Sequence, residues 1–254
     1  MEKISILGQP LAVTDYLGAV SEILKLARDH RQTYAVGAAN TMVVTLARHE
    51  PQFREVMNQF DLVVPDGMPL IWCLNRGLPA DRQLADRVYG PELMLRVLNA
   101  TQGQPEFRHF FLGGAPDVLQ QLTEKMRSRF PGSSIAGTYS PPFGQWDETE
   151  QQNITDRIRN SGANLIWVGL GCPKQERWIA ARKKMLPPGV YFGIGAAFAF
   201  HAGRVKNAPP WIQKMGMEWA FRLLMEPRRL FSRYLKFNSL FIRYLITDKS
   251  LPAN

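Results

Sequence analysis

Asp66 is the residue of this sequence that is best placed for acid–base chemistry. It follows the apolar run Leu62-Val63-Val64-Pro65, which is typical of a buried strand, and it precedes Gly67. A carboxylate at a strand end can serve as a general base when a substrate hydroxyl lies within hydrogen-bonding reach. Asp-Gly is also typical of a turn in which the aspartate caps the next helix. The residues alone leave both interpretations open.

A second candidate for chemistry is the segment GLGCPKQERW, residues 169–178. Gly169 and Gly171 allow the backbone to approach a ligand closely. Lys174, Gln175 and Glu176 then begin a helix whose N-terminal amides favour an anion. The segment lacks the third glycine of a dinucleotide-binding fingerprint. It therefore predicts either an anion-binding turn or an ordinary tight connection between a strand and a helix.

The elements that must position these residues alternate between strand and helix from the N-terminus to Gly195. After an N-terminal strand, the expected strands are 33–38, 61–66, 109–114, 133–140, 164–171 and 190–195, and helical patterns separate them. This alternation predicts an α/β fold with a parallel sheet and helices on both faces.

Ligands of open α/β sheets bind at the carboxyl ends of the strands. In addition to Asp66 and residues 169–176, those ends contain Asn40, Gly67, Gly113, Gly114 and Gly195. We interpret the Gly113–Gly114 turn as a structural turn that also has access to a nucleotide. These loops are the expected ligand-binding edge of the sheet.

The pattern changes near Asn207, which divides the chain into a core of residues 1–206 and an appendage of residues 207–254. The last 44 residues hold eight Lys/Arg and three Asp/Glu, which is +5 of a total net charge of +9. At about 100° per residue, Leu230, Tyr234, Phe237, Phe241 and Tyr244 form one apolar stripe. The cations that border it are Arg222, Arg229, Arg233, Lys236 and Arg243.

Cations beside an aromatic stripe are typical of a helix lying in a membrane interface. The alternatives are packing against the chain's own core and packing between subunits of a homo-oligomer. The first residues do not resemble a signal peptide, and no apolar run is long enough to span a bilayer. With only two cysteines, the composition favours a cytoplasmic protein.

Several common catalytic motifs are absent from the sequence. It has no Asp-x-Asp pair for a metal–diphosphate complex, no Walker loop, no Gly-x-Ser-x-Gly elbow and no His/Cys cluster. No metal and no cofactor are therefore expected, and a bound diphosphate would have to be neutralised by arginines. Two alternative functions are a nucleotide-sugar epimerase or dehydrogenase, and a nucleic-acid-binding module that uses the basic tail. Nucleic acid is not an expected partner.

Six segments in order resemble the WecG/TagA/CpsF glycosyltransferases over nearly the whole chain. They are PDGMPL, DRVYGPELM, FLGG, GLGCPKQERW, GIGAAFAFHAG and APPWIQKMGMEWAFRLLMEPRRL. The resemblance implies a Rossmann-like, metal-independent, inverting enzyme at the cytoplasmic face of the plasma membrane. Such an enzyme moves a sugar from a UDP-sugar onto a sugar attached to a polyprenyl diphosphate. The donor would be either UDP-glucose, for exopolysaccharide, or a UDP-N-acetylmannosamine or uronate type.

By the same resemblance, Asp66 is the expected general base and Gln175 corresponds to a motif glutamine. Three tail arginines, Arg222, Arg229 and Arg233, are expected to reach the diphosphate. The full set of expected substrate- and nucleotide-binding residues is Asn40, Gly67, Arg87, Gly113, Gly114, Gly169, Gly171, Lys174, Gln175, Glu176 and Gly195. The resemblance also implies that the tail docks on the bilayer.

Overall fold

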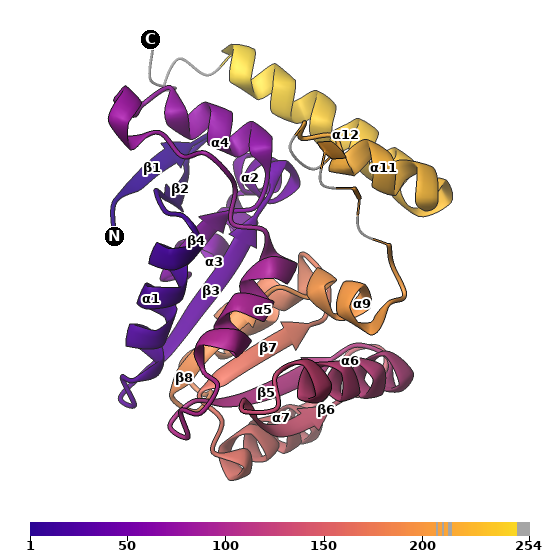
Figure 1. Cartoon of the computed structure of the whole chain (residues 1–254). Coiled ribbons are helices and arrows are strands. Elements are labelled where there is room, and N and C mark those ends of the chain that lie inside the picture. Colours follow the sequence, from indigo (N-terminus) through magenta and orange to yellow (C-terminus); the bar gives the residue numbers. More distant parts are fainter. Residues whose placement is uncertain (207, 210, 213–214, 248–254) are drawn as a thin grey trace. The chain divides into compact units, whose positions relative to one another are not determined.

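The computed structural model describes residues 1–206, 208–209, 211–212 and 215–247, except the side chains of Arg229 and Arg233. Its centre is a six-stranded parallel sheet of order β4-β3-β8-β7-β5-β6 (Figure 1). The strands are β3 (Thr33–Ala39), β4 (Leu62–Pro65), β5 (Arg108–Gly113), β6 (Ser134–Tyr139), β7 (Leu165–Gly169) and β8 (Gly189–Gly193). The predicted α/β class, with a parallel sheet and helices at the C-terminal end of the chain, is confirmed.

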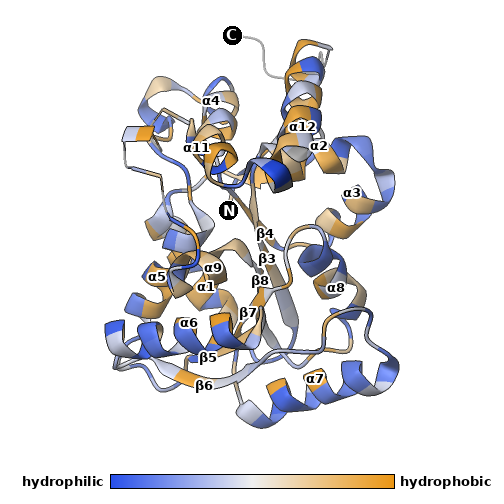
Figure 2. Ribbon diagram, turned by 90° about the vertical axis from the view of Figure 1, so that its right-hand side faces the viewer, coloured by the Kyte–Doolittle hydropathy of each residue, from blue (hydrophilic) through white to orange (hydrophobic). Residues whose placement is uncertain are grey.

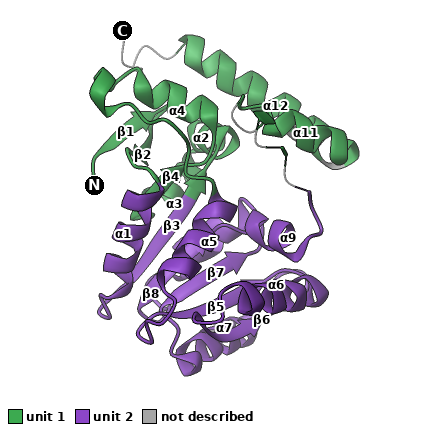
Figure 3. Cartoon of the chain, viewed as in Figure 1, with its two compact units in different colours: residues 1–15, 38–89, 207–254 green, residues 16–37, 90–206 purple. Residues whose placement is uncertain are grey.

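The chain divides into two compact units (Figure 3). Unit 1 comprises residues 1–15, 38–89 and 207–254, and unit 2 comprises residues 16–37 and 90–206. Asn207, at which the sequence predicts the start of the appendage, lies outside the described residues. The described part of the tail falls in the same unit as Asp66.

Helices cover both faces of the sheet in unit 2 (Figure 2). One face carries α1 (Tyr16–Ala27), α5 (Gly90–Ala100), α6 (Pro116–Arg129) and α9 (Ala196–Ala202); the other carries α7 (Glu148–Ser161) and α8 (Lys174–Arg182). The central strands β7 and β8 are buried along almost their whole length. Their nearly continuous apolar sequences follow from this two-sided burial.

Aromatic rings and one buried histidine fill the centre of unit 2. Trp167 stacks on Phe192 with ring centroids 3.9 Å apart, and it donates a hydrogen bond of 3.1 Å from Nε1 to His109 Nδ1. On the other side of the imidazole, Nε2 lies 2.8 Å from the Thr101 hydroxyl. Since Nδ1 accepts from Trp167, the ring proton sits on Nε2 and is donated to Thr101. The imidazole therefore has no place for a second proton without breaking the bond from Trp167.

We expect His109 to make the protein sensitive to acid. Burial lowers the pKa of His109 to about 3, well below the value of about 6.5 in an unfolded chain. Because the pKa is lower in the folded state, the unfolded state binds the proton first as the pH falls. The free energy of unfolding therefore decreases between pH 6.5 and 3, by up to about 1.4 kcal/mol per pH unit. Replacing His109 with Gln should flatten this part of the profile, measured by urea unfolding between pH 7 and 4.5. The exposed His30→Gln is the control, and an unchanged slope in His109→Gln would contradict the assignment.

Unit 1 contains an antiparallel hairpin that the sequence did not predict. The N-terminal strand was expected to begin the alternating pattern, but β1 (Lys3–Ile6) pairs with β2 (Gln9–Ala12) in a separate two-stranded sheet. The two turn residues explain the difference, because Leu7 and Gly8 have φ of 53° and 85°. Two successive positive φ values close a tight two-residue hairpin turn.

Helices make up most of the rest of unit 1. The predicted helical run after Asn40 is two helices, α2 (Thr41–His49) and α3 (Pro51–Asn58), which separate at Glu50 because Pro51 has no amide hydrogen to continue α2. The remaining helices are α4 (Met68–Asn75), a 3₁₀ turn (Ala80–Arg82), α11 (Glu218–Met225) and α12 (Pro227–Thr247). Of these, α12 lies along α2 (Figure 1).

The apolar stripe predicted to face a membrane packs inside unit 1 instead. Leu230 and Phe241 are only 3% and 5% exposed, and the Tyr244 hydroxyl lies 2.9 Å from His49 Nδ1 on α2. For this stripe, the alternative of packing against the chain's own core is correct. The helix is apolar on more than one side, so the sequence pattern could not distinguish the covered face from the open one.

A different stripe of α12 is open to solvent. It consists of Phe231, Leu235, Ile242 and Ile246, which are between 58% and 80% exposed. These four positions fall within about 60° of one another around the helix. Lys236 and Arg243, both exposed, flank them on one side.

Candidate functional site

Asp66 lies directly after β4, at the carboxyl end of that strand. Its amide donates a hydrogen bond of 2.7 Å to the carbonyl of Ala39, the last residue of β3. The helix that follows, α4, has Gly67 rather than Asp66 at its N-cap position. The helix-capping interpretation of Asp66 is therefore wrong. The strand ends instead present a half-buried carboxylate.

Two buried residues of unit 1, Arg87 and Glu218, form a charged cluster near Asp66 with the partly buried Tyr89. The Arg87 guanidinium forms an ion pair of 2.5 Å with Glu218 of α11 and lies over the Tyr89 ring, 4.4 Å from its centroid. Burial would lower the pKa of Arg87, but the carboxylates of Asp66 and Glu218 outweigh this and raise it. Burial raises the pKa of Tyr89, and the two carboxylates raise it further. The cluster thus brings a guanidinium and a neutral phenol together with the carboxyl groups of Asp66 and Glu218.

Asn40 and Gly67 mark the starts of the two helices that follow β3 and β4. Asn40 is the N-cap of α2, and its Oδ1 accepts from the amides of Met42 at 3.1 Å and Val43 at 3.2 Å. The side-chain oxygen thus accepts from backbone amides, while the Nδ2 group can donate a hydrogen bond to a ligand. Gly67 has extended backbone geometry, with φ of −177°.

In unit 2, the side chain of Gln175 ties two glycine turns together. Its Oε1 accepts hydrogen bonds of 3.1 Å from the amides of both Gly171 and Gly195. Its Nε2 donates to Glu176 Oε1 at 2.9 Å, and both side chains are almost fully buried. Gln175 therefore fixes the shape of the turns at the ends of β7 and β8.

Another pair of predicted positions meets at the ends of β5 and β7. The amide of Gly114 donates to the carbonyl of Gly169 at 3.0 Å. At Gly113, with φ of 99°, an added Cβ would lie only 2.8 Å from the same carbonyl, so no other residue fits there without moving the backbone. Lys174, at the first turn of α8, lies over the ring of Phe143. The predicted glycines of unit 2 thus lie in turns at the carboxyl edge of its strands.

The turn around Gln175 gives a direct prediction for stability. Gly195 has an ordinary φ of −62°, but an added Cβ would lie 2.4 Å from Gln175 Oε1. Gly195→Ala should therefore expel the amide and cost about 1–3 kcal/mol through strain and lost hydrogen bonds. In the Gln175→Ala background the same substitution should cost less, because the closest clash is gone and only the tight contacts of 3.1 Å with Gly169 Cα and Gly171 N remain. Urea unfolding of the four proteins tests this, and additive losses would contradict it.

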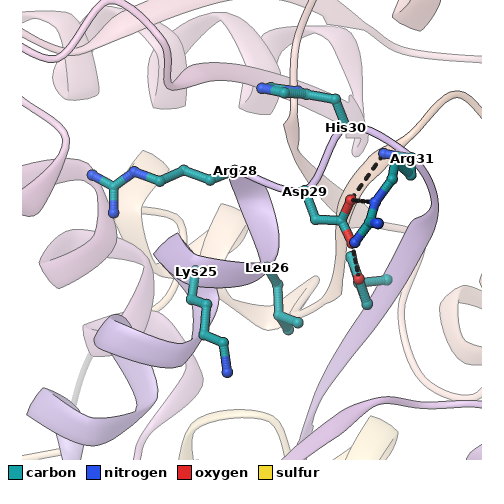
Figure 4. A pocket seen from close by; sticks show the side chains of 7 residues that line it. Lys25, Leu26, Arg28, Asp29, His30 and Arg31 are labelled. Carbon is teal, nitrogen blue, oxygen red and sulfur yellow. Dashed lines mark hydrogen bonds and ion pairs between the residues drawn. The ribbon is translucent and has the colours of Figure 1, made fainter.

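Unit 2 has a surface cavity that none of the predicted site residues lines (Figure 4). It is lined by Lys25, Leu26, Arg28, Asp29, His30, Arg31 and Tyr34. Arg31 Nε donates to the Asp29 carboxylate at 2.8 Å and, with Tyr34, lowers the pKa of Asp29. The cavity lies between the end of α1 and the start of β3, which is the amino end of that strand. Since ligands of such sheets bind at the carboxyl ends, it is not a candidate active site.

In residues 1–206 and the described parts of the tail, no group of three or more His, Cys, Asp or Glu side chains could hold a metal ion. Across those same residues, none of the helices combines the length and apolarity needed to cross a bilayer.

The model of the Glycosyl transferase WecG/TagA/CpsF family matches residues 4–253. This chain belongs to that family. A similar protein is the N-acetylglucosaminyldiphosphoundecaprenol N-acetyl-beta-D-mannosaminyltransferase of Bacillus spizizenii, which is 29% identical over 210 residues. The match covers 83% of this chain and 78% of the relative. The family resemblance is confirmed, and the chain is a glycosyltransferase, not the epimerase or dehydrogenase weighed as an alternative.

The resemblance to the WecG/TagA/CpsF family implied that three arginines of the tail reach the diphosphate. Arg222 lies on α11, where it is partly buried, one turn after Glu218. Arg229 and Arg233 belong to α12, but their side chains lie outside the described residues. Their expected contact with a diphosphate stays a prediction.

Sequence reasoning missed two residues of the cluster in this glycosyltransferase. Tyr89 lies in the quoted DRVYGPELM segment, two residues after Arg87, and Glu218 is one of only three acidic residues in the last 44. A lone carboxylate in a basic, aromatic helix is a signal that could have suggested a buried partner. The partner itself, Arg87, could not be identified from spacing.

Proposed function

We propose that this glycosyltransferase moves a sugar from a UDP-sugar onto a sugar already linked to undecaprenyl diphosphate, in the synthesis of a cell-surface polysaccharide. The name of the Bacillus relative describes an acceptor of this kind and an N-acetylmannosaminyl group. The observation that carries the proposal is the position of Asp66. It is a strand-end carboxylate that does not cap the next helix and lies beside a buried arginine.

In the proposed reaction Asp66 is the general base. Its carboxylate takes the proton of the acceptor hydroxyl while the hydroxyl oxygen bonds to the anomeric carbon of the donor. The bond between that carbon and the phosphate oxygen of UDP breaks, and its electron pair leaves with UDP. A single displacement of this kind inverts the anomeric configuration.

In the proposal, arginines and a helix N-terminus bind the negatively charged diphosphates of the substrates. Arg222, Arg229 and Arg233 are the proposed partners of the diphosphate in the tail. In unit 2, the turn that contains Gly171 leads into α8, whose first-turn amides and Lys174 suit a phosphate. Gln175 and Glu176 fix the conformation of this turn through their hydrogen bonds. No step of the proposed reaction needs a metal.

Two donors fit the proposal. The relative's name favours a UDP-N-acetylmannosamine type, and UDP-glucose is the second candidate. Neither the Gln175 turn nor the Asp66 cluster contains a feature that selects between them.

The proposal places the enzyme peripherally on the cytoplasmic face of the membrane. A lipid-linked acceptor requires the enzyme to work at a bilayer surface, and the exposed stripe of α12 supports such a contact. Phe231, Leu235, Ile242 and Ile246 would enter the interface while Lys236 and Arg243 lie near lipid phosphates.

Product analysis tests the proposed reaction. The purified protein is incubated with each UDP-sugar and with undecaprenyl-diphosphate-N-acetylglucosamine, and the lipid-linked product is identified by mass spectrometry. The expected product carries one added sugar whose anomeric configuration, read by NMR, is opposite to that of the donor. A product of retained configuration would rule out the single displacement.

A further inference from the structure

Glu218, in the described tail, forms an ion pair with Arg87, one of the predicted substrate-binding residues. It begins α11, and its carboxylate lies 2.5 Å from the Arg87 guanidinium. Both side chains are about 10% exposed or less. A buried arginine cannot shed its charge, so removing a carboxylate partner from it is costly. Glu218 therefore fixes where the guanidinium lies.

We propose that Glu218 is a positioning residue for the transfer reaction: from α11 it holds Arg87 beside Asp66 and shares the charge of the guanidinium. This inference rests on the proposed function, because it concerns the base of that reaction. Beyond the proposed function, it assigns Glu218, in the first turn of α11, a role in positioning the groups around the general base Asp66.

The reason lies in what happens when Asp66 accepts a proton. Before the step, Arg87 has two carboxylates near it, those of Asp66 and Glu218. After it, Asp66 is neutral, and Glu218 is the carboxylate that still balances the buried guanidinium. If Glu218 were neutral, Asp66 would be the main counterion of Arg87, and protonating Asp66 would remove that negative charge from beside the buried guanidinium. Asp66 would then be a weaker base.

The charged and titratable groups to consider around Asp66 come from two elements besides its own strand. The segment before α5 supplies Arg87 and Tyr89, and α11 supplies Glu218. Tyr89 is neutral at ordinary pH. A change that neutralises Glu218 alone therefore leaves Asp66 as the main counterion of Arg87.

The test compares Glu218→Gln with the wild-type chain in acceptor-dependent UDP release. Gln has the same shape without the charge. We expect kcat to fall about 10- to 100-fold while the KM for the UDP-sugar changes by less than about threefold. The acidic limb of the kcat–pH profile should move to lower pH, because Asp66 is left as the main counterion of Arg87. Glu55→Gln, which removes an exposed carboxylate of α3 in the same unit, is the matched control and should behave like the wild type.

The outcomes separate the inference from the function on which it rests. An active wild type with a fully active, unshifted Glu218→Gln would overturn the inference alone. A wild type that transfers no sugar with any donor would overturn the proposed function, and the role of Glu218 in it as well. If Glu218→Gln does not fold, Glu218→Asp decides: its shorter side chain should lower kcat at least about threefold at unchanged KM, and a wild-type kcat would overturn the inference.

A double-mutant cycle gives a readout that does not depend on activity. Arg87→Gln and Glu218→Gln should each lower the midpoint of urea unfolding. The double variant should be at least as stable as the less stable of the two single variants. Additive losses would show that the two side chains do not act together and would overturn the inference.

Discussion

Replacing Asp66 with Asn should lower kcat for sugar transfer by at least about 100-fold, the lower end of what a general base contributes. The amide has nearly the shape of the carboxylate but cannot take the proton of the acceptor hydroxyl. Because Gly67 caps α4, the substitution removes no helix cap, and the fold should be retained. Binding of the UDP-sugar, measured by calorimetry, should change by less than about threefold because the base acts on the acceptor.

Asp81→Asn is the matched control for this experiment. Asp81 is an exposed aspartate of the same unit, in the 3₁₀ turn, and its replacement should leave kcat unchanged. An Asp66→Asn protein with wild-type kcat would remove Asp66 from the mechanism. A protein that has lost donor binding as well would point to a role in holding the UDP-sugar.

The exposed stripe of α12 should govern binding to membranes. Changing Phe231, Leu235, Ile242 and Ile246 to Ser removes four apolar side chains that are now in water. Full burial of one such side chain contributes about 1.5–3 kcal/mol, so even partial insertion of four predicts a fall of at least about 100-fold in the vesicle partition coefficient. Sedimentation with anionic phospholipid vesicles measures this.

The control for the stripe removes apolar surface from unit 2. Leu17 and Met185 are 79% and 51% exposed, and changing both to Ser should leave vesicle binding unchanged. If the α12 variant still sediments with vesicles like the wild type, the membrane contact must lie elsewhere. If it remains dispersed while the wild type self-associates without lipid, the stripe is an interface between copies of the chain.

The sheet could be predicted because each of its strands carries a strong local signal. Residues 165–169 and 189–193 are apolar throughout, and a strand buried on both faces requires this. The hairpin of β1 and β2 was missed for the opposite reason. Its two strands have four residues each, and its turn depends on a positive φ at Leu7, a residue type that gives no turn signal.

The candidate site was only partly predictable. Asp66 could be found because it stands directly after a strand, at the edge where ligands bind. Its capping role could be rejected only from backbone geometry, because Gly67 occupies the cap position. The hydrogen bond of Gln175 with Gly195, 20 residues along the chain, and the ion pair of Arg87 with Glu218 join separate segments of the sequence. Spacing in a single sequence holds no information about such pairs.

For α12, periodicity identified an amphipathic helix but selected the wrong face. The stripe through Leu230 and Phe241 is larger and more aromatic, and it is the one that α2 requires for packing. The smaller stripe through Phe231 and Ile246 is the one open to solvent. Burial of the more aromatic stripe follows from the greater apolar area that packing removes from water.

Acceptor-dependent release of UDP is the measurement that tests the central claim most directly. The full-length protein is given a panel of UDP-sugars, including the N-acetylmannosamine and glucose donors, with and without undecaprenyl-diphosphate-N-acetylglucosamine. We predict rapid release only when the lipid acceptor and one particular donor are both present. Release that is equally fast without the acceptor, or that fails with every donor and acceptor pair, would contradict the claim that this glycosyltransferase transfers a sugar to a lipid-linked acceptor.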